Sequence, residues 1–250
     1  MISIKSNREL NLMRKAGRIV GITHSVLKDY IKPGISTLEL DTIAYNTIIK
    51  YKGIPSFKGY GGFPKSICTS INDTLIHGIP DNTILKDGDI ISIDIGVNYQ
   101  GYHGDSAWTY PVGNVDSKIL EFLKVCEESL YIGLNQVKSN NRIGDISNSI
   151  QTYIEDKGYS IPKDYTGHGI GNELHEEPYV PNIGKANTLE LLKEHMTLAI
   201  EPMIIMGKPH TIVLDDNWTV KSLDKSLTAH YEHTIVVKVD GYEILTKKEG

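Results

Sequence analysis

Two aspartates, Asp94 and Asp105, flank a segment with the pattern of a β-hairpin. The first arm covers residues 89–97 and the second covers residues 102–110, with turn residues in the loop 98–101 between them. A hairpin centred on this loop places the two aspartates directly opposite each other, with Cβ atoms roughly 4.5–5.5 Å apart. Like charges in that arrangement destabilise a sheet unless something neutralises them. A pair of divalent cations would do so, and the spacing therefore predicts a metal site.

Three further ionisable side chains lie among glycines or apolar residues. His168 lies between two glycines, and Glu201 and Glu232 each lie inside an apolar run that is typical of a strand. A carboxylate in such a run is costly to ionise unless it is paired or binds a metal. Each residue alone has an ordinary alternative, as a turn or surface carboxylate or a loop histidine. Taken together, the set favours one shared site.

The residue types in this set indicate which ions it would bind. Four carboxylates and one imidazole, without a thiolate, suit Mn²⁺, Fe²⁺, Co²⁺ or Zn²⁺. The set holds more negative ligands than a single catalytic zinc uses. It fits two divalent metal ions about 3.5–4 Å apart, bridged by carboxylates and a water.

The elements that must position these residues repeat along the chain. A capping box at Ser6 predicts a helix that ends before residues 32–34, and a second capping box at Ser36 predicts a helix to about Lys52, stopped by Gly53. Two more amphipathic helices are expected over about 117–137 and 145–157, followed again by strands. The repeat predicts an α+β fold with two pseudo-symmetric halves, about 1–112 and 113–250, in a single domain that covers residues 1–250.

Composition limits the class of protein. The net charge is −5 and the pI is near 6.0, which argues against a nucleic-acid-binding protein. The two cysteines, Cys68 and Cys126, cannot form a disulfide framework and indicate a reducing compartment. The N-terminus lacks the apolar segment of a signal peptide, and no stretch approaches the ~20 apolar residues of a membrane span. We therefore expect a cytoplasmic protein that does not bind membranes.

The order of motifs resembles that of bacterial type I methionine aminopeptidases over essentially the whole chain. The motifs are His77-Gly-Ile-Pro80, Ile93-Asp94, Gly104-Asp105, Gly167-His168-Gly-Ile-Gly171, His175-Glu-Glu-Pro178, Ile200-Glu201-Pro-Met203 and Tyr231-Glu232-His-Thr234. The resemblance implies the pita-bread fold, in which antiparallel sheet is covered by helices in two related halves. It also implies a dinuclear-metal exopeptidase that removes the N-terminal methionine from nascent proteins and peptides with a small second residue.

The resemblance also implies a role for each residue. Asp94 would chelate one metal, Asp105 and Glu232 would bridge both, and His168 and Glu201 would complete the second. His77 and His175 would lie beside the substrate as catalytic histidines that bind no metal, and Glu201 would also carry a proton to the leaving amine. From the sequence alone, both histidines could equally be surface residues.

The methionine pocket is where the resemblance loosens. Its expected lining is Phe57, Tyr60, Phe63, Cys68, Leu174 and Trp218. Better-known bacterial members carry cysteine in place of Phe57, tyrosine in place of Phe63 and phenylalanine in place of Leu174. They also carry histidine in place of Gly61, close to this set in the sequence. The larger Phe57 and smaller Leu174 could compensate in volume or could reshape the pocket.

Two alternatives therefore stay open. One is a related metal aminopeptidase with a different first-residue preference, and the other is a non-catalytic pita-bread module that binds peptides. The presence of all five ligand positions weighs against the second. We expect a monomer whose partners are peptide and nascent-protein N-termini; whether it also binds the ribosome is left open by the sequence.

Overall fold

A computed structural model of the chain describes residues 2–247. Within this range the helices are α1 (Asn7–Lys28), α2 (Thr37–Lys50), α3 (Ser117–Leu134), α4 (Ile143–Asp156) and the short 3₁₀ helix η1 (Tyr60–Gly62). The strands are β1 (Ile54–Pro55), β2 (Cys68–Ile71), β3 (Thr74–Ile76), β4 (Ile90–Tyr99), β5 (Tyr102–Pro111), β6 (Thr166–Gly169), β7 (Glu176–Pro181), β8 (Thr197–Ile200), β9 (Met203–Ile205), β10 (Thr211–Val213), β11 (Val220–Ser222), β12 (Thr228–His230), β13 (His233–Lys238) and β14 (Gly241–Ile244). No helix between residues 2 and 247 is both long enough and apolar enough to cross a membrane.

Both predicted capping boxes begin a helix. The Ser6 hydroxyl accepts from the backbone N–H of Glu9, whose carboxylate accepts in return from the N–H of Ser6 at 2.7 Å. Ser36 and Glu39 form the same pair at the start of α2. These bonds satisfy N–H groups that have no partner inside the helix, which is why the two starts could be found from sequence.

The end of α2 differs from its prediction. The positive φ that ends the helix belongs to Lys52, at 64°, rather than to Gly53. Gly53 instead packs against β4, where a Cβ atom would lie 2.7 Å from the Val97 side chain. The glycine therefore serves close packing and not the turn.

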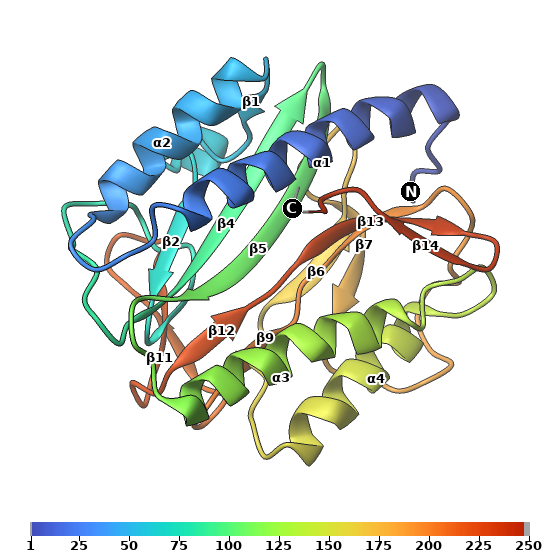
Figure 1. Cartoon of the computed structure of the whole chain (residues 1–250). Helices are drawn as coiled ribbons and strands as arrows, with labels where there is room; N and C mark the ends of the chain where they lie inside the picture. Colours follow the sequence, from blue (N-terminus) through green and yellow to red (C-terminus); the bar gives the residue numbers. More distant parts are fainter. Residues whose placement is uncertain (1, 248–250) are drawn as a thin grey trace.

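The strands form two main antiparallel sheets. In the first, β4 pairs with β5 along one edge and with β1 and β2 along the other. The second has the order β14-β13-β8-β6-β7. Figure 1 shows α1 and α2 over the β4–β5 hairpin and α3 and α4 beside the second sheet. This arrangement confirms the predicted antiparallel sheets covered by helices, and the internal duplication stays a prediction.

The register of the β4–β5 hairpin corrects the predicted pairing. Asp94 pairs with Ala107 and Asp105 pairs with Gly96, so the aspartates are not directly opposite. The loop is the two-residue turn Gln100-Gly101, one position later than expected, and both residues have a positive φ as such turns require. Because this slip moves the pairing by two residues, it keeps both side chains on one face, as diagonal neighbours.

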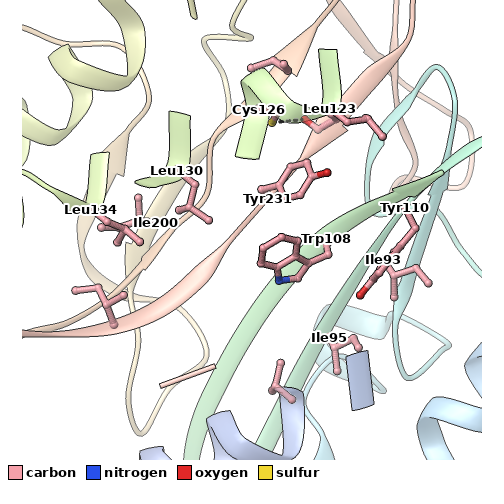
Figure 2. Close-up of a cluster of buried hydrophobic side chains, with 14 of the residues drawn as sticks. Ile93, Ile95, Trp108, Tyr110, Leu123, Cys126, Leu130, Leu134, Ile200 and Tyr231 are labelled. Atoms are coloured by element: carbon pink, nitrogen blue, oxygen red, sulfur yellow. Dashed lines mark hydrogen bonds between the residues drawn. The ribbon is translucent and has the colours of Figure 1, made fainter. Parts of the chain in front are cut away.

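The hydrophobic core joins the two sheets. The Trp108 ring of β5 meets the Tyr231 ring edge-on, with centroids 5.0 Å apart, and Ile93 of β4 and Leu130 of α3 belong to the same cluster (Figure 2). Residues from both ends of the chain thus share one core. This shared core holds β5 against the segment around Tyr231, which also carries Glu232.

Two glycines allow α1 to lie directly on its neighbours, β5 on one side and Leu245 after β14 on another. A Cβ atom on Gly104 would lie 2.8 Å from the backbone nitrogen of Gly17, and one on Gly17 would lie 2.3 Å from the carbonyl oxygen of Leu245. Both obstacles are backbone atoms, which cannot rotate away. The helix therefore depends on the absence of side chains at these positions.

Gly17→Ala should destabilise the protein although alanine is the better helix former. Helix propensity favours alanine by about 1 kcal/mol, whereas overpacking against backbone costs about 1–3 kcal/mol. We expect a net loss of about 1 kcal/mol in the free energy of unfolding, measured with urea. Arg8→Ala, at an exposed position of the same helix, should change it by less than about 0.5 kcal/mol. A more stable Gly17→Ala protein would contradict this close packing.

Candidate metal centre

The five predicted ligands come from five separate segments. Asp94 lies on β4, Asp105 on β5 and His168 on β6. Glu201 and Glu232 were predicted inside strands, and this is wrong. They lie in the breaks between β8 and β9 and between β12 and β13. Pro202 accounts for the first break because it has no N–H to donate to a ladder. At both glutamates the strand pairing stops, and the side chain lines the same cavity as the aspartates.

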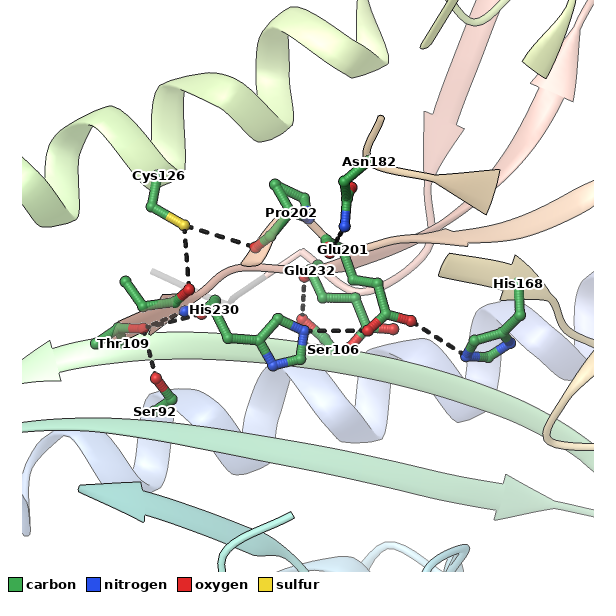
Figure 3. Close-up of polar contacts among 11 residues, drawn as sticks. Ser92, Ser106, Thr109, Cys126, His168, Asn182, Glu201, Pro202, His230 and Glu232 are labelled. Carbon is green, nitrogen blue, oxygen red and sulfur yellow. Dashed lines mark hydrogen bonds and ion pairs between the residues drawn. The ribbon is translucent and has the colours of Figure 1, made fainter. Parts of the chain in front are cut away.

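The structure brings these side chains together. Ligand atoms of Asp105, His168 and Glu232 all lie within 4.8 Å of one another. Asp94 and Asp105 line the same cavity, and each carboxyl group shifts the pKa of the other. Glu201 completes the group through one oxygen 3.6 Å from Nε2 of His168 (Figure 3).

His168 is oriented by its own neighbour. Its Nδ1 lies 2.8 Å from the carbonyl oxygen of Gly169 and must donate to it, because a carbonyl can only accept. The proton is therefore on Nδ1, and Nε2 presents a lone pair toward the carboxylates. A histidine that binds metal is commonly fixed in this way.

Burial makes the acidic groups hard to ionise. It raises the pKa of Asp105 to about 7 and that of Glu201 to about 8. The pKa values of Asp94 and Glu232 lie well above the usual range because of burial and of repulsion by neighbouring carboxylates. Burial lowers the pKa of His168 to about 3, so this imidazole is neutral and brings no positive charge.

Several polar atoms at the centre of this group lack protein partners. Among the described residues, Oδ1 of Asp94, Oδ1 of Asp105 and Oε1 of Glu232 are buried and accept no hydrogen bond. Buried polar atoms are rarely left in this state. Clustered oxygen donors with one imidazole are the ligands that borderline divalent cations prefer. The residues present therefore fit a divalent metal.

The two predicted catalytic histidines line the same cavity. Nδ1 of His175 lies 2.7 Å from the Tyr60 hydroxyl, and the His175 ring is 4.3 Å from that of His168. His77 faces the edge of Trp218, with ring centroids 6.0 Å apart. Burial lowers both pKa values, that of His77 to about 4, so both rings are neutral near pH 7.

The cavity that the acidic group lines has a volume of about 120 Å³, and much of the rest of its lining is apolar. All six predicted pocket residues line it: Phe57, Tyr60, Phe63, Cys68, Leu174 and Trp218. Gly61 is held at a φ of 54°, and a Cβ atom there would lie 3.1 Å from the Trp218 ring. The glycine thus lets the indole close this side of the pocket.

A model of metallopeptidase family M24 matches residues 11–239. The chain belongs to this family. It is 54% identical to methionine aminopeptidase 1 of Bacillus subtilis over 99% of this chain and 100% of that one. It is 48% identical to methionine aminopeptidase of Clostridium perfringens, over 98% and 99% of the two chains. These relatives confirm the resemblance that the motifs indicated.

Solved structures agree with this M24 assignment. The methionine aminopeptidase from Rickettsia prowazekii superposes with a TM-score of 0.97 at 42% identity, over 98% of this chain and 100% of that one. The prolidase from Pyrococcus furiosus has a TM-score of 0.81 at 22% identity, over 99% of this chain and 66% of its own, and shares the fold alone. The predicted pita-bread fold is confirmed, and membership of M24 implies the use of a divalent metal.

Two residues that line the cavity of this M24 chain, His230 and Ile76, are absent from the set predicted from sequence. Nε2 of His230 lies 3.3 Å from the Glu201 carboxylate, and burial lowers the pKa of the ring to about 4. A signal was present, because His230 comes two residues before Glu232 and side chains alternate along an extended chain. Nothing local in the sequence distinguishes Ile76 from a core residue.

Metal removal should make stability depend on pH. Without cations, Asp105 and Glu201 hold protons in the folded chain up to about pH 7 and 8, but only to about pH 4 when unfolded. The stability that these protons contribute is full below about pH 4, falls as the pH rises from there, and is lost once the pH has passed about 7 and 8. Bound cations replace these protons and remove the loss.

The measurement is the melting temperature of chelated and Mn²⁺-loaded protein between pH 6.5 and 9. The gap between the two should widen with rising pH, and metal uptake at pH 7 should release protons. The buried histidines do not contribute to this pH dependence. Their pKa values are lowered, so they change stability only below about pH 6.5. A gap that stays constant across this range would contradict the buried acidic cluster.

Proposed function

We propose that this chain removes the N-terminal methionine from unblocked polypeptides with a small second residue, by hydrolysis of the first peptide bond with two divalent cations. The observation that carries the proposal is a buried group of four carboxylates and one neutral imidazole in the same cavity as a set of apolar and aromatic side chains. The methionine aminopeptidases that match this chain over nearly its whole length support the same activity.

Five side chains would hold the cations: Asp94, Asp105, His168, Glu201 and Glu232. When bound, the cations supply Lewis acidity toward the scissile carbonyl, lower the pKa of a water and bind a free α-amine. The unpartnered oxygens of Asp94, Asp105 and Glu232 are the groups that such ions would satisfy. A preference for a free amine makes the reaction an exopeptidase reaction.

Glu201 is the residue proposed to move the proton. Its carboxyl lies between the imidazoles of His168 and His230, at 3.6 and 3.3 Å. A carboxylate that lines the cavity can take a proton from water and give it up again to a leaving group. It would accept the proton of the attacking water and deliver it to the leaving amine.

His175 is proposed to stabilise the carbonyl oxygen during attack. With the Tyr60 hydroxyl as the donor to Nδ1, the ring proton would lie on Nε2 and would be a donor for the substrate. The lowered pKa keeps the ring neutral, so Nδ1 stays available as an acceptor. His77 lies on the Trp218 side of the cavity, where it would contact the amine end of the substrate.

The apolar cavity is proposed to take the methionine side chain. Its walls are the aromatic rings of Phe57, Phe63 and Trp218 together with Leu174 and Cys68, which suit an unbranched apolar group. The natural substrates would be the N-termini of new proteins. The ligand set suits Co²⁺, Mn²⁺, Fe²⁺ and Zn²⁺ alike.

A blocked peptide should not be cleaved. Chelated protein should be inactive, added Mn²⁺ should restore hydrolysis of Met-Ala-Ser, and acetyl-Met-Ala-Ser should stay intact because its nitrogen cannot bind a cation. Product release is measured by chromatography of both peptides under the same conditions. Cleavage of the acetylated peptide at a comparable rate would show that the amine is not recognised.

The first residue should be selected by the apolar pocket. In a panel of X-Ala-Ser peptides, methionine should exceed other apolar residues and proline by about tenfold or more in kcat/KM, since pocket shape contributes roughly 1–3 kcal/mol. Another residue in first place would support the alternative, a related aminopeptidase with altered preference. The substitutions at Phe57, Phe63 and Leu174 would then be the first sites to examine.

A further inference from the structure

The edge of β5 that faces away from β4 meets the segment that carries Glu232. Asp105 lies on this edge, and its carboxylate and that of Glu232 approach the same point. Among the described residues, no regular strand pairing joins β5 to β12 or β13. The backbone groups along this edge therefore need other partners.

Thr234 supplies both partners at Asp105. Its hydroxyl accepts from the backbone N–H of Asp105 at 2.9 Å and donates to the carbonyl of the same residue at 2.8 Å. Thr234 is fully buried, so no water competes for these bonds. One hydroxyl thus satisfies both the backbone N–H and the backbone carbonyl of Asp105, a proposed metal ligand.

The same device recurs at the other end of the contact. The Thr109 hydroxyl donates to the carbonyl of His230 at 2.9 Å and accepts from its N–H at 3.0 Å (Figure 3). Between the two threonines the chains touch more directly, through the N–H of Glu232 and the carbonyl of Ala107 at 2.8 Å. Hydroxyl bridges therefore flank the Glu232 contact on both sides.

A hydroxyl between two backbones acts as a spacer. Strands joined by direct hydrogen bonds lie about 4.7–4.9 Å apart, whereas an inserted oxygen lets them stand wider with every N–H and C=O still satisfied. At Thr234 and at Thr109 a hydroxyl therefore sets the spacing of the two backbones, on either side of the direct contact at Glu232. Valine has nearly the same shape as threonine but cannot make these hydrogen bonds. A threonine-to-valine substitution therefore tests the contribution of the hydroxyl separately from that of side-chain volume.

We propose that Thr234 is a positioning residue whose hydroxyl fixes the backbone of Asp105 relative to Glu232 and so sets the spacing of the carboxylates for a shared divalent cation. The inference rests on the proposed metal-dependent function and adds to it a residue outside the ligand set. Thr234 acts through Asp105 and itself needs no contact with metal or substrate.

The test is the dissociation constant for Mn²⁺, measured by calorimetry on the full chain after chelation. Thr234→Val should weaken binding about 10–100-fold, the usual effect of removing a group that orients a ligand. Thr234→Ser keeps the hydroxyl and should stay within about threefold of the parent. Thr23→Val is the matched control, because this buried threonine loses one bond, to the Ile19 carbonyl, within α1.

Melting temperatures of the same variants separate positioning from general stability. If Thr234→Val and Thr23→Val lose similar stability and both bind Mn²⁺ as the parent does, the inference is overturned. If Thr234→Val does not fold, the Mn²⁺ affinities of Thr234→Ser and Thr234→Ala, which carry smaller side chains, are compared instead. Equal affinity in that pair overturns the inference, and weaker binding by the alanine variant alone supports it. A parent that binds no Mn²⁺ would instead overturn the proposed function, and the inference with it.

Discussion

The mutual repulsion of buried carboxylates is the constraint on which this structure depends. Asp94, Asp105, Glu201 and Glu232 share a site from which water is largely excluded, and their pKa values are raised as a result. The imidazoles beside them are neutral and offset none of the charge. Such a group persists only if the surrounding fold holds it rigidly, and it lowers its free energy when divalent cations replace the protons.

The fold meets this constraint by distributing the acids over two sheets that share one core. Trp108 and Tyr231 pack at the contact between them, Gly104 lets α1 lie directly on the hairpin, and Gly17 lets it lie against Leu245. Rigid strands carry the aspartates, while the two glutamates sit at breaks in strand pairing. The chemistry therefore lies between elements that are far apart in sequence but cannot move independently.

Much of the helical frame was predictable because its signals are local. Ser6 and Ser36 cap helices through bonds to residues three positions later, and such bonds leave a readable pattern. The hairpin was placed correctly but its turn was off by one residue, since several turn residues adjoin one another around Gln100. The predicted common face of Asp94 and Asp105 survived because side chains alternate with a period of two.

Residue chemistry and short-range periodicity were enough to predict the ligand types and the common face of the two aspartates, while the lining of the cavity was predicted only through the family resemblance. Three contacts became visible only in the folded chain: His230 with Glu201, Tyr60 with His175 and Thr234 with Asp105. The residues of each pair are separated by 29, 115 and 129 positions. Contacts over such separations arise from the packing of whole sheets, and no local pattern in the chain encodes them.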